Sequence, residues 1–138
     1  MIVSLHVASG AAVGAAAGSR RAAVGLGLLA HIAGDRVPHR DIPSRRFEVR
    51  SGAAVLLLVA LRRGVLDPAT IGAAAASAPD LEHVLPLPRP GGRKLFPSHR
   101  FYGWHREGGL PAWLQLLMAG TLAGLVVSRR RSRSGSPR

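Results

Sequence analysis

Apolar segments of helical length alternate with short polar breaks along most of this chain. They cover residues 2–18, 22–35, 52–63, 68–76 and 110–127, and most of them are longer than an average strand. No stretch of useful length alternates apolar and polar residues as a half-buried strand does. The pattern therefore predicts an all-α protein, built as a bundle of four or five mostly apolar helices.

Prolines and acids indicate where these helices begin and end. Pro38 is expected to end the second helix near residues 36–37, because the residue before a proline disfavours the helical conformation. Residues 41–50 are polar and contain proline, so a loop is expected there. Asp67 and Pro68 have the residue types preferred at the N-cap and first position of a further helix. Irregular or only briefly helical structure is then expected at residues 77–80, 86–93 and 96–109.

The first apolar segment carries Gly10, Gly14 and Gly18 at intervals of four residues. This spacing places them on one face of a helix, where a second helix can approach closely. A secretory signal is the alternative interpretation, since small residues lie at 15–17. Against it, no positive charge precedes the apolar stretch.

The last apolar segment, residues 110–127, has no charged side chain over 18 residues and just reaches the length of a transmembrane helix. Residues 129–138 follow it with five arginines and no acid, and are expected to form a disordered basic tail. By the positive-inside rule, this tail would keep the C-terminus cytoplasmic. A buried core helix with a solvated tail is the alternative.

Composition limits both the organisation and the chemistry of the chain. Its 138 residues allow one domain, which is assigned to residues 1–128. The absence of cysteine excludes disulfides, thiolate zinc sites, iron–sulfur clusters and a cysteine nucleophile. A formal charge of +12 favours an anionic partner. No known nucleic-acid-binding motif accompanies the arginines, so nucleic acid is not the expected partner.

Acids and histidines are concentrated in three short windows, residues 31–41, 80–83 and 99–107. Five of the seven acids and five of the six histidines lie there, and the sixth histidine, His6, lies inside the first apolar segment. Ionisable residues within apolar helices usually have a partner or a function. We therefore expect the chemistry of this protein in these windows.

The first window contains a pair of residues with metal-ligand spacing. His31 and Asp35 are four residues apart and share one helix face, where an imidazole and a carboxylate can hold one divalent cation. His39 and Asp41 follow Pro38 and could fold back over the same point. A histidine–aspartate hydrogen bond without a metal is the alternative interpretation.

The second window pairs Asp80 with His83, three residues later on the same face, and Glu82 is expected to point to solvent. Asp80 would also suit the positive end of a helix dipole without any metal. Around the third window, residues 96–109 hold four of the six aromatic residues and could wall a pocket or form an interfacial aromatic belt. The candidate ligands there are His99 and His105, and the candidate substrate-binding residues are Arg100, Tyr102 and Trp104.

The order of these motifs resembles the small membrane-bound metal-dependent hydrolases of bacteria. The segments AHIAGDRVPHRD, SAPDLEHVL and FPSHRFYGWH carry the resemblance, which spans about residues 1–110. HIAGD followed by proline and histidine is also similar to the HxxGDxxxPxH helix of zinc-dependent phospholipase C and P1-type nucleases. In those enzymes the two histidines and the aspartate bind zinc, and the substrates are phosphodiesters. Here His39 follows Asp35 after four residues rather than six, and Glu82 replaces the second acid of the PDxDH motif.

The resemblance implies a metal centre with nitrogen and oxygen ligands, in a protein of the bacterial inner membrane. Such ligands suit Zn²⁺, Mn²⁺ or Fe²⁺, and their number is sufficient for two or even three ions. The implied reaction is hydrolysis of a phosphoester, including that of a lipid, by a metal-activated water, with Asp35 or Asp80 taking the proton or bridging metals. The candidate metal ligands are His6, His31, Asp35, His39, Asp41, Asp80, His83, His99 and His105.

Two other classes of function fit the same residues. In a non-catalytic membrane protein, the histidines and acids would form interhelical hydrogen bonds. In a metal-binding or metal-sensing protein, they would hold an ion without leaving an open coordination position.

Overall fold

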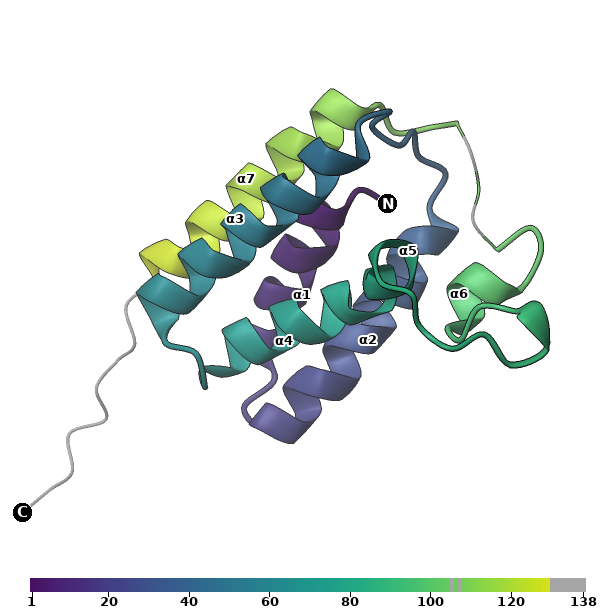
Figure 1. Ribbon diagram of the computed structural model, residues 1–138. Coiled ribbons are helices and arrows are strands. Elements are labelled where there is room, and N and C mark those ends of the chain that lie inside the picture. The colour runs from purple at the N-terminus through teal and green to yellow at the C-terminus, as the bar shows by residue number, and fades with distance from the viewer. Residues whose placement is uncertain (105, 107, 130–138) are drawn as a thin grey trace, which may run out of the picture.

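The computed structural model describes residues 1–104, 106 and 108–129. These residues form helices and no strand, apart from one isolated bridge between His39 and Leu110. The prediction of an all-α protein is confirmed. The long helices are α1 (Val3–Ala16), α2 (Arg20–Arg36), α3 (Arg45–Arg63), α4 (Pro68–Ser77) and α7 (Ala112–Ser128) (Figure 1). Shorter helical turns lie between α4 and α7: η1 (Ala78–Asp80), α5 (Leu81–Val84), η2 (Pro90–Gly92) and α6 (Pro97–Arg100).

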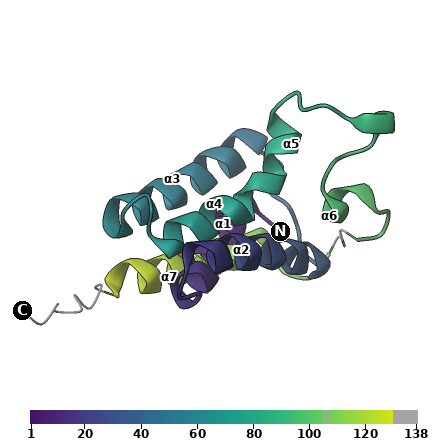
Figure 2. The same cartoon turned by 90° about the horizontal axis from the view of Figure 1, so that it is seen from below.

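Helix α1 is the central helix and packs against α2, α3, α4 and α7. Figures 1 and 2 show these helices arranged round it. Apart from His6, the α1 sequence is apolar or small on every side, which suits a helix that has neighbours all round. Val7 and Ala11 of α1 form one core cluster with Val59 of α3 and with Ala69 and Ala73 of α4.

Glycines allow α1 and α2 to approach α4 closely. A Cβ atom added to Gly10 would lie 2.4 Å from the Cβ atom of Ala76, and one added to Gly14 or Gly27 would meet the α4 backbone at 2.3 or 2.5 Å. The predicted close-packing face is thus confirmed for Gly10 and Gly14. It does not extend to Gly18, which follows the end of α1 with a φ of 68° and open space around it.

Two predicted helix boundaries are confirmed. Asp67 accepts a hydrogen bond from the N–H of Ala69 at 2.9 Å and so caps α4. Helix α2 ends at Arg36, two residues before Pro38, so Asp35 lies in its last turn.

The prediction of a loop over residues 41–50 is wrong for the second half of this segment. Helix α3 begins at Arg45, where Ser44 accepts a hydrogen bond from the N–H of Phe47 at 3.3 Å. Arginines make this first part of α3 polar, so it lacks the apolar run from which a helix over residues 52–63 was predicted. The additional turns matter because they bring Arg45 beside the cavity described below.

The C-terminal apolar segment forms α7. Its small residues Ala119 and Ala123 are buried in a core cluster with α1, whereas Trp113 and Leu117 are exposed. No helix among the described residues is both long and apolar enough to cross a membrane. Most of the tail that was predicted to be disordered, residues 130–138, lies outside the described residues.

Candidate metal centre

Six of the ligands predicted from the sequence converge in the structure. They come from five elements of the fold: His6 (α1), His31 and Asp35 (α2), Asp80 (η1), His83 (α5) and His99 (α6). Within the part of the chain that the structure describes, three triplets have ligand atoms within 4.8 Å of one another, close enough to hold a metal ion. These triplets are His6–His31–Asp80, His31–Asp35–His99 and Asp80–His83–His99.

Helix packing and one hydrogen bond fix the orientation of His31. The close approach of Gly27 to α4 brings this part of α2 against Ala76. The carbonyl oxygen of Ala76 can only accept, so His31 donates its Nδ1–H to it at 2.8 Å. In the neutral ring, Nε2 then carries the lone pair, and it lies 3.1 Å from Oδ2 of Asp35. This arrangement is typical of metal-binding histidines, which are held in place through their other ring nitrogen.

Glu82 orients His99 in the same way. Its Oε1 accepts a hydrogen bond from Nδ1 of His99 at 2.6 Å, and its Oε2 accepts one from the N–H of Leu95 at 2.8 Å. Burial raises the pKa of Glu82, but the hydrogen bonds from Leu95 and His99 outweigh it and lower the pKa, so the carboxyl group is ionised at neutral pH.

The expectation that Glu82 points to solvent is wrong, because only 3% of the residue is exposed. The 3₁₀ turn η1 precedes α5, so the 3.6-residue period of one continuous helix does not apply across residues 78–84. The contact by which Glu82 positions His99 was therefore not predicted from the sequence. The second carboxylate of the PDLEH motif was the signal that pointed to it.

Asp35 lies between the two oriented imidazoles. Its Oδ2 is 3.1 Å from Nε2 of His31 and 3.3 Å from Nε2 of His99, and the two Nε2 atoms are 3.4 Å apart. Burial raises the pKa of Asp35, but its contacts with His31, His6 and His99 hold the pKa well below its usual range. Burial also lowers the pKa of His99, yet Asp35 and Glu82 outweigh it and raise the pKa. The site thus favours an added positive charge, whether a proton or a cation.

His6 completes the buried side of the cluster. Its ring stacks on that of His31 with 4.0 Å between the centroids, and its Nε2 lies 3.0 Å from Oδ1 of Asp35. Burial lowers the pKa of His6 to about 3, which the hydrogen bond to Asp35 only partly offsets. His6 is therefore neutral at physiological pH and has a lone pair available for a metal ion.

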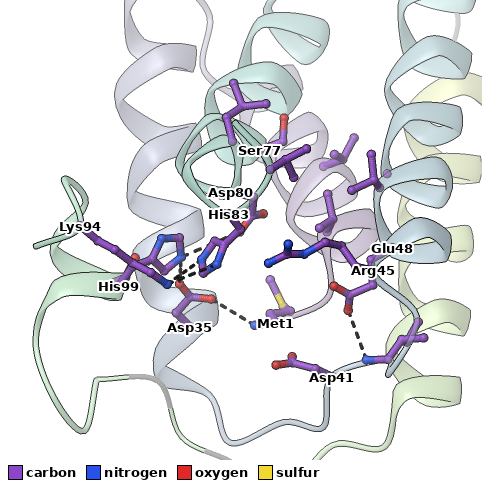
Figure 3. Close-up of a pocket in the computed structure, with 18 of the residues that line it drawn as sticks. Met1, Asp35, Asp41, Arg45, Glu48, Ser77, Asp80, His83, Lys94 and His99 are labelled. Carbon is purple, nitrogen blue, oxygen red and sulfur yellow. Dashed lines mark hydrogen bonds and ion pairs between the residues drawn. The ribbon is translucent and has the colours of Figure 1, made fainter. Parts of the chain in front are cut away.

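Asp80 and His83 form the side of the cluster that faces a cavity (Figure 3). Oδ1 of Asp80 lies 3.8 Å from Nε2 of His99, and burial raises the pKa of Asp80 to about 6. His83 packs edge-on against His99 with 4.4 Å between the ring centroids. Burial, followed by the charges of His99 and Lys94, lowers the pKa of His83 to about 4.

The donor set of this cluster fits a divalent cation. Among the described residues, the buried atoms His6 Nδ1 and Asp80 Oδ2 have no hydrogen-bond partner. Buried polar atoms without partners are uncommon, and such a group is explained if an ion binds there. Imidazole nitrogens and carboxylate oxygens are the ligands that Zn²⁺, Mn²⁺ and Fe²⁺ accept.

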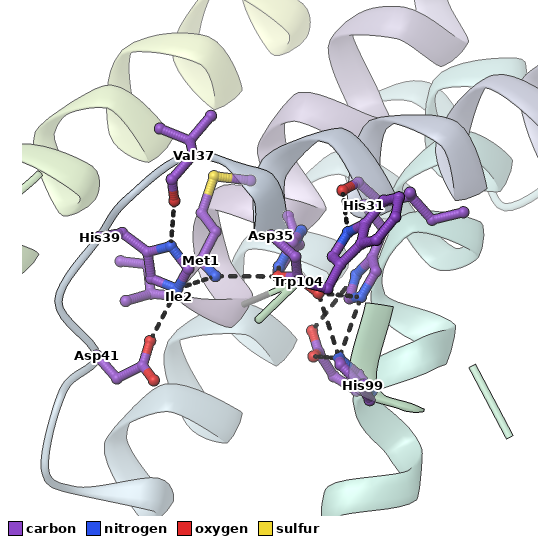
Figure 4. Close-up of polar contacts among 12 residues, drawn as sticks. Met1, Ile2, His31, Asp35, Val37, His39, Asp41, His99 and Trp104 are labelled. Atoms are coloured by element: carbon purple, nitrogen blue, oxygen red, sulfur yellow. Dashed lines mark hydrogen bonds and ion pairs between the residues drawn. The ribbon is translucent and has the colours of Figure 1, made fainter. Parts of the chain in front are cut away.

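His39 and Asp41 lie to one side of this cluster (Figure 4). His39 donates its Nδ1–H to the carbonyl oxygen of Val37 at 2.6 Å, and its Nε2 lies 3.2 Å from Oδ1 of Asp41. The same Nε2 contacts the backbone nitrogen of Met1, which lies 3.1 Å from Oδ1 of Asp35. His39 and Asp41 belong to none of the three candidate metal-binding triplets of the described residues.

The predicted substrate-binding residues have different surroundings. Tyr102 lines the cavity and is fully exposed, whereas Arg100 and Trp104 are not among its described lining residues. The indole N–H of Trp104 donates to the carbonyl oxygen of Ile32 at 3.3 Å, and Arg36 lies over its ring, so this side chain packs against α2 (Figure 4). His105, the remaining predicted ligand, lies outside the described residues.

The cavity beside the cluster has a volume of about 760 Å³. Asp35, Asp80, His83 and His99 line one side of it, and Arg45 reaches in from α3 on the other (Figure 3). Arg45 was not among the predicted site residues, because a loop was expected at its position.

In comparisons with known proteins, no family model, no curated protein and no solved structure matches this chain.

Proposed function

We propose that this protein is a metal-dependent hydrolase that cleaves a phosphoester. The observation that carries the proposal is the meeting of His31 Nε2, His99 Nε2 and Asp35 Oδ2 within 3.4 Å of one another. With both rings neutral and donating Nδ1–H, the two Nε2 lone pairs and the carboxylate oxygen face one point, where a cation or a proton is needed to balance them. His6 and Asp80 supply further ligands for the same ion or for a second one.

A bound divalent metal would lower the pKa of a coordinated water towards neutrality and polarise a phosphoryl oxygen. Asp35 is then the buried anion that holds the ion between the histidines. Asp80 would take the proton from that water, because its carboxyl group faces the cavity. Zinc is the proposed metal, with Mn²⁺ and Fe²⁺ as alternatives for the same ligands.

A phosphoester is the proposed substrate for two reasons. The motifs resemble those of membrane-bound metal-dependent hydrolases and, more distantly, those of zinc-dependent phospholipase C. The cavity also carries Arg45 and Lys94 as cationic side chains near the cluster, and such groups bind phosphoryl oxygens.

The test is hydrolysis of bis(p-nitrophenyl) phosphate by protein loaded in turn with Zn²⁺, Mn²⁺ or Fe²⁺. We expect Asp35→Asn to reduce both metal content and rate, the latter by about 100-fold or more. Asp41→Asn is the matched control for metal content, because Asp41 lines the same cavity but belongs to none of the triplets found among the described residues, and it should leave the metal content unchanged. Stoichiometric metal without hydrolysis would instead favour a metal-binding or metal-sensing protein.

Association with the bacterial inner membrane is part of the proposal. Helices α3 and α7 lie side by side (Figure 1). They expose the large apolar side chains of Leu57, Leu61, Trp113 and Leu117, which are 59–75% accessible. Large apolar side chains exposed on a pair of packed helices suit contact with an apolar surface such as a membrane. We expect the protein to float with vesicles of anionic phospholipids and expect Leu57→Asp with Leu61→Asp to abolish flotation. A protein that stays at the bottom of the gradient in both forms would contradict membrane binding.

A further inference from the structure

The cavity beside the cluster indicates what kind of phosphoester would fit. We infer that it binds a single-chain amphiphile, with the phosphate between the metal cluster and Arg45 and the hydrocarbon chain along an apolar wall. This inference rests on the proposed metal-dependent function and adds to it the class of substrate. The cavity volume of about 760 Å³ lies within the range of small-molecule sites, about 300–1,000 Å³.

The polar end of the cavity combines the cluster with two cationic side chains. Lys94 Nζ lies 3.2 Å from Nδ1 of His83, and Arg45 reaches from the first turn of α3 towards Asp80 and His83 (Figure 3). The positive charge of Arg45 contributes to the lowered pKa of His83. A phosphate placed between these side chains and the cluster would meet cationic donors on both sides.

The charges of the cavity make anion binding depend on the metal. Its described lining residues include four carboxylates and two cations, namely Asp35, Asp41, Glu48, Asp80, Arg45 and Lys94. A divalent ion bound at the cluster would offset negative charge of these carboxylates and would so strengthen phosphate binding.

The other end of the cavity is apolar. Its wall is formed by side chains from three helices, Val3 and Val7 of α1, Val49, Ala53 and Leu56 of α3, and Leu81 and Val84 of α5. None of these wall residues is charged, so a hydrocarbon chain lying along them would contact only apolar side chains. Each methylene buried there strengthens binding by about fourfold, which corresponds to about 0.8 kcal/mol.

Neighbouring residues of α3 provide matched variants for both ends. Arg45 lines the cavity and Arg46 does not, so Arg45→Met and Arg46→Met compare the loss of one charge inside and outside the site. Ala53 and Ala54 are both exposed, and only Ala53 lines the cavity, so Ala53→Trp fills the apolar end while Ala54→Trp adds the same ring outside it. Ala53→Leu is a milder filling variant that serves if Ala53→Trp does not fold by circular dichroism.

The experiment measures the affinity of the full-length, Zn²⁺-loaded protein for inorganic phosphate and for methyl, hexyl and decyl phosphate by calorimetry, below their critical micelle concentrations. We expect affinity to rise steeply with chain length, and to fall at least tenfold for every phosphate when the metal is chelated. Arg45→Met should weaken all four ligands by a similar factor. Ala53→Trp should remove the advantage of decyl over methyl phosphate, and Arg46→Met and Ala54→Trp should change nothing.

Equal affinities for all four phosphates would overturn this inference, as would a chain-length effect that Ala53→Trp and Ala53→Leu leave unchanged. Either result would leave the proposed hydrolase intact, provided that the protein binds metal and cleaves bis(p-nitrophenyl) phosphate. Failure of metal binding in the wild-type protein would instead overturn the proposed function itself.

Discussion

His31 and His99 direct their Nε2 atoms at each other across 3.4 Å, although 68 residues separate them in the chain. Each ring is held from behind by an acceptor, the carbonyl oxygen of Ala76 for His31 and the carboxylate of Glu82 for His99. Because each acceptor binds the Nδ1–H of its ring, both Nε2 atoms are turned towards Asp35, where they can bind a cation or a proton. This geometry is the basis of the proposed metal centre.

Glu82 should affect metal affinity without touching the metal. Replacing it by glutamine keeps an acceptor for the N–H of Leu95 but removes the negative charge behind His99. We expect Glu82→Gln to weaken Zn²⁺ binding by about 10- to 100-fold, as is usual when the partner of a metal-binding histidine is changed. Competition with a fluorescent zinc chelator measures this.

The control for this variant is Glu48→Gln. Glu48 lines the cavity and accepts a hydrogen bond from the N–H of Ile42, but among the described residues it makes no hydrogen bond or ion pair with a member of the three candidate metal-binding triplets. Equal zinc affinities for Glu82→Gln and Glu48→Gln would refute the positioning role of Glu82.

His6 should make the stability of the metal-free protein depend on pH. Its pKa is lowered by burial to about 3 in the folded state, whereas the unfolded chain has the usual value of 6.5. Between these values the unfolded state binds more protons, so the contribution of neutral His6 is complete above pH 6.5 and is lost as the pH falls towards 3. From pH 6.5 to 4 the free energy of unfolding of the wild type should fall by about 2–3 kcal/mol more than that of His6→Gln.

Urea unfolding of both proteins in the presence of a chelator at several pH values measures this difference. The comparison with His6→Gln removes the contributions of Asp80 and His83, which are present in both proteins. A difference between the two proteins that stays constant from pH 7 to 4 would show that His6 is not buried in neutral form.

Gly10 should be sensitive to the addition of a single methyl group. A Cβ atom there would lie 2.4 Å from the Cβ atom of Ala76 in α4. Ala76 is also the residue whose carbonyl oxygen accepts the hydrogen bond from His31. We expect Gly10→Ala to destabilise the fold by about 1–3 kcal/mol. Gly25→Ala is the matched control, since Gly25 lies in α2 with open space around it and alanine favours the helix. Thermal unfolding compares the two, and equal melting temperatures would contradict the close packing of α1 on α4.

Much of the fold could be predicted from local chemistry. The apolar segments, the Asp67 cap and the Pro38 break placed most helix boundaries close to where the structure has them, because each depends on neighbouring residues only. The start of α3 was missed because three arginines, Arg45, Arg46 and Arg50, hid the helix behind a polar surface. In retrospect Ser44 as an N-cap and Glu48 in the first turn were local signals for it.

The candidate site was predictable in its members and less so in its arrangement. Histidines and acids in apolar helices pointed to His6, His31 and Asp35, which the structure brings together. The side of α5 on which Glu82 lies depends on a 3₁₀ turn, and its contact with His99 depends on tertiary packing. The entry of Arg45 into the cavity depends on the same long-range packing, so neither residue could be placed from spacing alone.

The most direct test of the metal centre is the metal content of the purified protein. Wild-type protein is dialysed against Zn²⁺ and then against metal-free buffer, and its metal is measured by mass spectrometry beside His31→Gln and His99→Gln. We expect at least one tightly held equivalent in the wild type and its loss in both variants, while all three proteins keep their helical circular dichroism. Wild-type protein that retains no stoichiometric metal, or variants that retain as much as the wild type, would contradict the proposed metal centre.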